Sequence, residues 1–137
     1  MTARPILLDT CALIWLGNND PLHSEAEAAL AAVAEQGGIL VSPISAWEIG
    51  ILCARSRITL SRPPSAWFGD VIESGVVLAA MPPSVLLESS FLPGTPPRDH
   101  ADRIVSATAR AFGYRLMTRD RLLLEYGQQG HIDVIAC

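Results

Sequence analysis

The sequence contains no lysine: all ten basic residues are arginines, set against 14 acidic residues in a chain of 137 residues with a formal net charge of −4. Without lysine the chain cannot form a Walker-type phosphate loop, in which a lysine contacts the β- and γ-phosphates of a nucleotide. It also cannot form a Schiff base through a lysine amine. A phospho-receiver domain or a small phosphatase is disfavoured too, because a receiver also uses a lysine beside its acidic pocket and no obvious nucleophilic aspartate motif is present.

Long apolar runs and paired cysteines are also missing. Apolar segments such as GVVLAAM stay far below the roughly 18 residues that a membrane-spanning helix needs, and the short run that ends at Asp9 does not resemble a signal peptide. Cys11, Cys53 and Cys137 are odd in number and form no CxxC pair, which indicates free thiols in a reducing compartment. We therefore expect a cytoplasmic protein with no membrane segment and no zinc site.

The length predicts one domain, residues 1–137, since domains typically run to about 100–150 residues. Half of the residues are hydrophobic, which is enough for a real core. The acidic net charge is unfavourable for passive nucleic-acid binding, because phosphates need cationic neutralisation. That objection weakens if some of the carboxylates hold a metal ion.

Apolar runs of strand length alternate with helical patterns along the whole chain. Strands are predicted over 3–9, 38–42, 76–81, 115–120 and 131–136. Helices are predicted over 11–17, 21–38, 45–57, 62–75, 83–90, 99–113 and 121–127. The strands are apolar throughout rather than alternating, which is typical of a mainly parallel sheet covered on both faces. The predicted fold class is a three-layer α/β/α single domain.

Acidic residues stand where such a sheet binds ligands, beyond the carboxyl ends of its strands. Asp9 ends the first strand, Glu48 lies in the first turn of the helix after the second strand, and Asp120 follows the fourth strand. Asp102 lies in the first turn of the long helix, one turn after Asp99. The fold is expected to bring these strand ends and helix starts side by side.

Taken singly, most of these acids have a local alternative role. Ser45 and Glu48 fit a capping box, Asp99 fits an N-cap with Asp102 beside the helix dipole, and Asp120 fits a cap as well. Asp9, at the end of an apolar strand, has the weakest local explanation. Taken together, carboxylates this close repel one another, and a hard divalent cation such as Mg²⁺, or Mn²⁺ as its substitute, relieves that repulsion.

Arginines flank the predicted acidic site. They are Arg98, Arg103, Arg119 and Arg121. Their guanidinium groups can bind phosphates bidentately. Alternatively, they are solvated residues paired with nearby acids. His100 lies between two of the acids but has little use at a carboxylate site for Mg²⁺. The tryptophans at positions 15, 47 and 67 fall at helical spacing among leucine and isoleucine, which favours core or dimer packing over base stacking.

Four segments in order, ILLDTCALIWL, VSPISAWEIGIL, RDHADRIVSATARAFGYRLMTRD and IDVI, resemble the PIN-domain ribonucleases, specifically VapC-type toxins of type II (VapBC) toxin–antitoxin pairs. The resemblance covers nearly the whole chain. It implies a catalytic and metal-binding quartet of Asp9, Glu48, Asp102 and Asp120, with Asp99 as a secondary acid. The family often carries proline where His100 stands, so no role for His100 follows.

The resemblance also implies Mg²⁺- or Mn²⁺-dependent endonucleolytic cleavage of RNA, a homodimer, and a cognate VapB-like antitoxin. Thr10 and Thr118 stand where the family commonly has a hydroxyl near the acids. Thr118 is also a candidate RNA contact, together with Arg103, Arg119 and Arg121. Two alternatives remain open: a non-catalytic PIN-like module that binds RNA or a partner, and a DNA-directed nuclease of the same fold, which the short chain disfavours.

Overall fold

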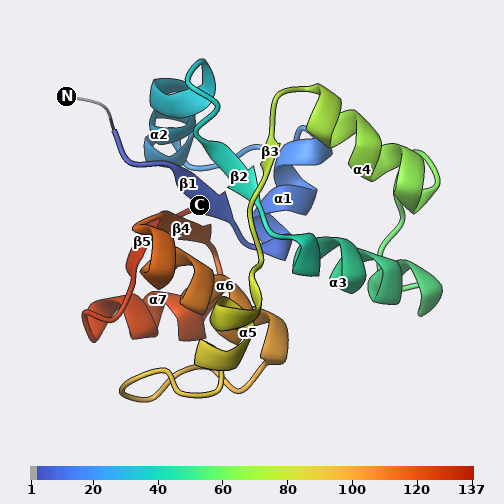
Figure 1. The fold of residues 1–137 in the computed structure, drawn as a ribbon. Coiled ribbons are helices and arrows are strands. Elements are labelled where there is room, and N and C mark those ends of the chain that lie inside the picture. The colour runs from blue at the N-terminus through green and yellow to red at the C-terminus, as the bar shows by residue number, and fades with distance from the viewer. Residues whose placement is uncertain (1–2) are drawn as a thin grey trace.

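The structure, a computed structural model, describes residues 3–137 and contains a five-stranded sheet in the order β3-β2-β1-β4-β5 (Figure 1). Every neighbouring pair of strands is parallel. The strands are β1 (Ile6–Leu8), β2 (Ile39–Val41), β3 (Val77–Leu78), β4 (Arg115–Thr118) and β5 (Asp133–Ala136). The predicted α/β class with a mainly parallel sheet is confirmed.

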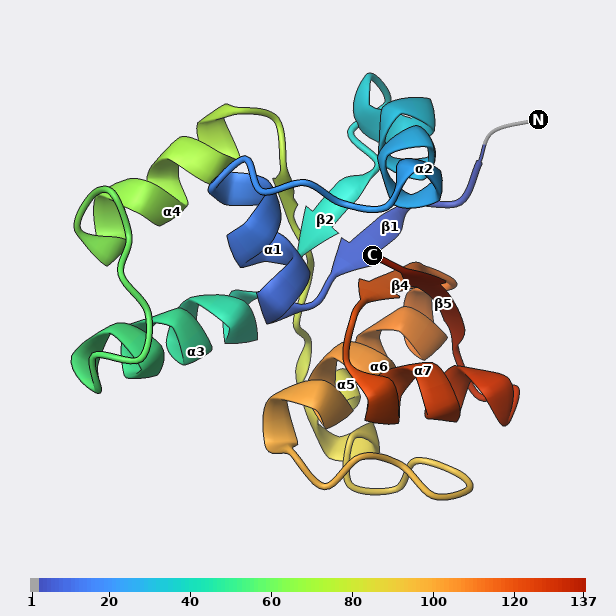
Figure 2. The ribbon, with the colours of Figure 1, turned by 180° about the vertical axis from the view of Figure 1, so that it is seen from behind.

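Helices cover both faces of this sheet, as Figures 1 and 2 show. They are α1 (Thr10–Gly17), α2 (Ser24–Ala34), α3 (Pro43–Ala54), α4 (Pro64–Glu73), α5 (Pro83–Glu88), α6 (His100–Phe112) and α7 (Arg121–Gln128). The helices that follow β1 and β2 pack mainly on one face, and those that follow β3 and β4 lie on the other, which is the arrangement that right-handed crossovers predict for this strand order. No helix within residues 3–137 is both long and apolar enough to cross a bilayer.

Alternation along β1 divides the hydrophobic core between the two faces. Ile6 and Leu8 pack with α1, α2 and α4, whereas Leu7 packs with α6 and α7. All three side chains are fully buried. A strand that is apolar at every position is therefore explained by burial on both sides, as in other parallel sheets.

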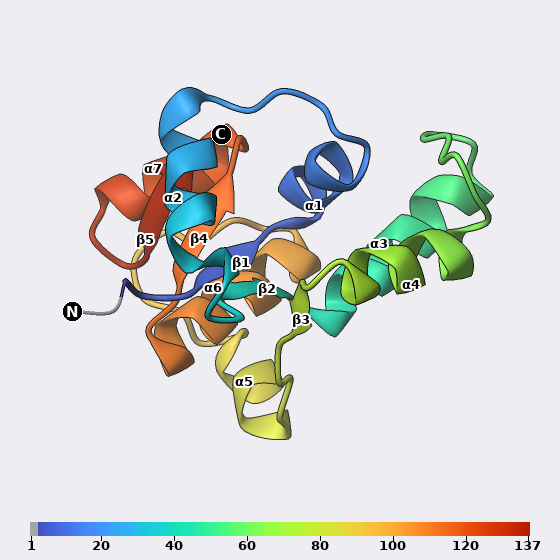
Figure 3. The same cartoon turned by 90° about the horizontal axis from the view of Figure 1, so that it is seen from above.

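The predicted boundaries of several elements are wrong, and two of these differences change how the chain crosses the sheet. The strand predicted over 76–81 shortens to two residues, because β3 lies at the edge of the sheet and pairs only with the end of β2. The helix predicted from Pro21 begins at Ser24, since the preceding residues form the long connection that carries the chain from α1 across to α2 (Figure 3). At the other end of the chain, Gly113 ends α6 in the left-handed conformation, with φ 72°, as predicted.

Gly17 makes room for the buried Trp67 of α4. A Cβ atom on Gly17 would overlap Cζ2 of the indole ring, whose Nε1 donates to Asn18 Oδ1 at 3.2 Å. We expect Gly17→Ala to lower the free energy of unfolding by about 1–3 kcal/mol, measured by urea denaturation. The matched control is Gly69→Ala in α4, where a Cβ meets nothing within 4 Å and added helix propensity stabilises by about 1 kcal/mol. Equal effects of the two changes would contradict this close contact.

Candidate active site

The candidate site lies between β1 and β4, where the order in which the strands are added to the sheet reverses. β1 and β4 are neighbours, but the helix after β1 covers one face and the helix after β4 covers the other. Asp9 directly follows β1, and Thr118 is the last residue of β4. The Thr118 hydroxyl donates to Asp9 Oδ2 at 2.5 Å. Open α/β sheets bind ligands at such switch points.

Asp9 is a buried carboxylate with both oxygens hydrogen-bonded. It is 4% exposed, and as the N-cap of α1 its Oδ1 accepts from the Ala12 N–H at 2.7 Å. Asp9 therefore does have a local capping role. Burial raises the pKa of Asp9, the bonds from Thr118 and Ala12 lower it, and the nearby Asp120 carboxylate raises it further.

Glu48 reaches the site from α3, but not as a capping-box residue. The helix begins at Pro43 with Ser42 as its N-cap, so Ser45 lies inside the helix and Glu48 in its second turn. The predicted capping box is therefore wrong. Instead Glu48 Oε1 accepts from the Thr10 hydroxyl, which lies 3.0 Å from the hydroxyl of the buried Ser45. Burial raises the pKa of Glu48, and the Asp99 and Asp9 carboxylates add to that increase.

Asp102 and Asp99 come from the start of α6. Asp99 is the N-cap, as predicted, and its Oδ1 accepts from the Asp102 N–H at 3.0 Å. The pKa of Asp102 rises to about 8, first because of burial and then because of the Asp99, Asp120, Glu48 and Asp9 carboxylates. The ionised form of this carboxyl group is therefore unfavourable in the folded protein until another charge compensates for it.

Asp120 enters from the loop after β4. It caps α7 as predicted, with Oδ1 accepting from the N–H groups of Leu122 and Leu123 at 2.7 and 3.3 Å. Its own N–H donates to Thr118 Oγ1 at 2.9 Å. Thr118, which is fully buried, thus joins Asp9 to Asp120 and is not available as the RNA contact that was predicted.

The structure brings all five predicted acids into one region: Asp9, Glu48, Asp99, Asp102 and Asp120. Their donors are carboxylate oxygens with threonine and serine hydroxyls around them, a set that suits Mg²⁺ or Mn²⁺ rather than zinc. Among residues 3–137, no three His, Cys, Asp or Glu side chains are preassembled into a metal-binding group. The chemistry of the donors fits a hard divalent cation, and their side chains would have to move together around it.

Cys11 is a site residue that sequence reasoning missed. The sequence indicated only a free thiol at this position, but the exposed Cys11 side chain lies among the acids at the start of α1. Burial raises the pKa of Cys11 to about 11, with further contributions from Asp9, Glu48, Asp102 and Asp120. Its position two residues after Asp9 at a helix start was the available signal.

Cys11 is therefore expected to react slowly with iodoacetamide despite its exposure. A rise of its pKa from 9.0 to about 11 lowers the thiolate fraction at pH 8 by about 100-fold, and the thiolate is the nucleophile. The measurement is the alkylation rate in a Cys53→Ser/Cys137→Ser background, with Cys11→Ser as the blank. Alkylation as fast as that of a free cysteine would contradict this expectation.

The arginines that flank the site differ in whether their guanidinium groups already have partners within the protein. Arg103 follows Asp102 on α6 and is half-buried, whereas the Arg121 side chain is 84% exposed and lies 3.6 Å from Glu125. Arg119 is occupied: its guanidinium donates to the Cys137 carbonyl and lies 3.7 Å from the ring centroid of Trp15. Arg119 is therefore a weak candidate for the predicted phosphate contact.

The three tryptophans differ in how deeply they are buried. Trp67 is buried in the core, as predicted, and Trp15 is half-buried beneath Arg119. Trp47, one residue before Glu48, is 56% exposed and is not a core residue of this chain. His100, the first residue of α6, is also exposed.

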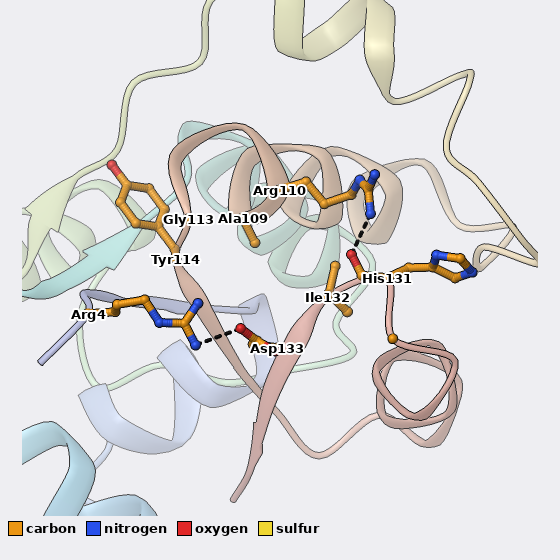
Figure 4. Close-up of a pocket in the computed structure, with 9 residues that line it drawn as sticks. Arg4, Ala109, Arg110, Gly113, Tyr114, His131, Ile132 and Asp133 are labelled. Carbon is orange, nitrogen blue, oxygen red and sulfur yellow. Dashed lines mark hydrogen bonds and ion pairs between the residues drawn. The ribbon is translucent and has the colours of Figure 1, made fainter.

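A hollow of about 310 Å³ lies at the opposite end of the sheet (Figure 4). It is lined at its rim by Arg4 and Asp133, which form an ion pair at 2.6 Å, and by Arg110, which donates to the His131 carbonyl at 2.6 Å. The Asp133 carboxylate already has a cationic partner there. This hollow therefore does not resemble the acidic site at the carboxyl ends of the strands.

Comparisons with known proteins agree with this fold. The family model described as PIN domain matches residues 6–128. The chain is 34% identical over 118 residues to Ribonuclease VapC22 of Mycobacterium tuberculosis (strain ATCC 25618 / H37Rv), covering 86% of this chain and 88% of that protein.

Two solved structures share the fold. One is VapBC2 from Rickettsia felis bound to a DNA fragment from its promoter, with a TM-score of 0.67 and 14% identity over 96% of this chain and 97% of that chain. The other is DNA-bound VapBC from Salmonella typhimurium, with a TM-score of 0.66 and 17% identity over 98% of each chain.

Proposed function

This chain belongs to the PIN domain family, and we propose that it is a divalent-metal-dependent endoribonuclease of the VapC type, the toxin of a type II toxin–antitoxin pair. The observation that carries the proposal is the gathering of Asp9, Glu48, Asp102 and Asp120 at the switch point of the sheet. The similarity to Ribonuclease VapC22 supports RNA as the substrate.

Asp9, Asp102 and Asp120 are the residues that would hold Mg²⁺ or Mn²⁺, with Glu48 and Asp99 beside them. When bound, such an ion supplies Lewis acidity and lowers the pKa of water. Thr118 and the Ala12 N–H orient the Asp9 carboxylate, and the α7 backbone orients that of Asp120.

Glu48 is placed to act on the attacking water. Thr10 donates to Oε1 of Glu48, which leaves Oε2 to accept a proton from water. The raised pKa of Glu48 makes this carboxylate a stronger base than an exposed glutamate. Arg103 and Arg121, with the exposed Arg98, supply cationic donors for the phosphates on either side of the scissile bond.

The proposed partners are single-stranded or loop RNA, a VapB-like antitoxin and a second copy of this chain, all in the cytoplasm. Solved structures of VapBC complexes share the fold, which supports an antitoxin partner. Large apolar side chains that stay exposed support protein contacts: Trp47, Val77, Leu78, Leu86, Leu87, Phe91, Phe112 and Leu122.

The test is incubation of the purified protein with total RNA, followed by sequencing of the new 5′ ends. We expect discrete cleavage positions with Mg²⁺ or Mn²⁺ and none with EDTA. RNA that is bound but never cut would favour the non-catalytic binding module instead. Faster cleavage of single-stranded DNA of the same sequence would favour the DNA-directed nuclease.

A further inference from the structure

Arg119 connects three segments that meet at the acidic site. Its Nε and Nη2 atoms donate to the Cys137 carbonyl at 3.0 and 2.7 Å. Its guanidinium carbon lies 3.7 Å from the ring centroid of Trp15 in α1. The Cys137 N–H, in turn, donates to the Thr118 carbonyl at 3.1 Å. One side chain therefore ties the turn after β4 both to α1 and to the residue after β5.

The residues on either side of Arg119 are the ones that hold the acids together. Thr118 donates to Asp9 and accepts from the Asp120 N–H. Asp9 is the N-cap of α1, the same helix that presents Trp15. The backbone that places Thr118 and Asp120 is thus fixed at its central residue, against the helix that Asp9 begins.

We infer that Arg119 is a positioning residue, which sets the distance between the Asp9 and Asp120 carboxylates by clamping residues 118–120 between Trp15 and Cys137. This inference rests on the proposed function, since positioning these carboxylates prepares the divalent-cation site. It replaces the phosphate-gripping role predicted for Arg119 from the sequence.

The chemistry of the clamp requires arginine. A guanidinium donates two hydrogen bonds to one carbonyl while its flat face lies on an aromatic ring, whereas a lysine ammonium is a point charge on a flexible stem. Arg119→Lys therefore keeps the charge and loses the geometry. This difference separates a positioning role from a purely electrostatic one.

The measurement is Mn²⁺ affinity by calorimetric titration of the metal-free protein, in the absence of RNA. We expect Arg119→Ala and Arg119→Lys each to weaken Mn²⁺ binding by about 10-fold or more, as loss of outer-shell support typically does. If Arg119 acted only through its charge, removal of a cation near the acids would tighten Mn²⁺ binding, and Arg119→Lys would match the wild type. Either of those results would overturn the inference.

Arg110→Ala is the matched control. Arg110 also donates to a backbone carbonyl, that of His131, but at the far end of the sheet (Figure 4). Its removal is expected to leave Mn²⁺ affinity unchanged. An equal loss in Arg110→Ala would mean that any weakening of the fold reduces Mn²⁺ binding, and the positioning role would be rejected.

A double-mutant cycle tests the clamp itself. If Arg119 acts through Trp15, the Mn²⁺ affinity of Trp15→Leu/Arg119→Ala should equal that of Arg119→Ala within about twofold, because the first change has already removed the shared contact. Fully additive losses would show that the two side chains act separately. Near-ultraviolet circular dichroism of each variant verifies that it is folded before titration.

The outcome also separates this inference from the proposed function. If the wild-type protein binds no Mn²⁺, the metal-dependent nuclease is wrong and the clamp has no site to position. If the wild type binds Mn²⁺ and cleaves RNA while both Arg119 variants bind Mn²⁺ equally well, only the positioning role fails.

Discussion

Asp9→Asn is expected to reduce RNA cleavage by at least about 10²–10³-fold, the loss typical when one preorganised electrostatic group is removed from an active site. Asparagine has nearly the same shape as aspartate, and its side-chain carbonyl can still accept from the Ala12 N–H at the N-cap of α1. It carries no charge, so it cannot share in holding a divalent cation or in compensating for one. The measurement is the rate of fragment formation with saturating Mg²⁺.

The same substitution is expected to preserve the fold. Burial raises the pKa of Asp9, so its ionised form costs free energy in the folded protein without metal. Asparagine removes this cost, and the metal-free variant should unfold at the same or a higher urea concentration than the wild type. Loss of cleavage is then not a result of unfolding.

Asp133→Asn is the control for this experiment. Asp133 is an exposed carboxylate paired with Arg4 at the opposite end of the sheet, and its loss should leave cleavage unchanged. Full activity of Asp9→Asn would remove Asp9 from the proposed catalytic quartet. Equal losses in both variants would show that cleavage does not depend on the acidic site in particular.

Residues that act through their own element could be placed from the sequence. Asp99 and Asp120 cap the helices that they precede, and Gly113 ends α6, because capping and left-handed glycines depend on a few adjacent residues. The parallel sheet followed from strands that are apolar at every position. From that sheet, the meeting of the acids at one edge followed as well.

The resemblance to the family placed the Thr10 and Thr118 hydroxyls near the acids, but the partners of their hydrogen bonds could not be predicted, because these bonds join residues distant in the chain. Thr10 contacts Glu48 across 38 positions and Thr118 contacts Asp9 across 109. The phase of α3 depends on where the helix begins, and Pro43 at its first position moved Glu48 from a capping role to a bond with Thr10. The cation–π contact of Arg119 with Trp15 has no local signature either.

The raised pKa of Asp102 predicts that the stability of the metal-free protein falls as pH rises. The pKa of Asp102 is about 8 in the folded state, against the ordinary aspartate value of 3.8. Between these values the folded state retains a proton that the unfolded state has lost, so the free energy of unfolding falls as pH rises. The decline should begin near pH 4 and level off above about pH 8, and it is measured by urea denaturation in EDTA.

Asp102→Asn should reduce the slope of the free energy of unfolding against pH by up to the amount that corresponds to one bound proton. The reason is that the variant cannot ionise at this position. Some decline remains, because the pKa values of Asp9 and Glu48 are also raised. Asp70→Asn is the matched control: Asp70 is exposed and paired with Arg62, and its replacement should leave the slope unchanged. An Asp102→Asn slope equal to that of the wild type would contradict the predicted charge repulsion.

Mg²⁺ should reverse the decline, and by more at pH 8 than at pH 5. A divalent cation binds the ionised carboxylates, so at low pH it must first displace their protons. At high pH the carboxylates are already ionised and repel one another, and the cation relieves that repulsion. Binding to the folded state alone then raises the urea midpoint by mass action. Asp102→Asn should gain less from Mg²⁺ at pH 8 than the wild type. Equal gains at both pH values would mean that Mg²⁺ stabilises the protein at some place other than these carboxylates.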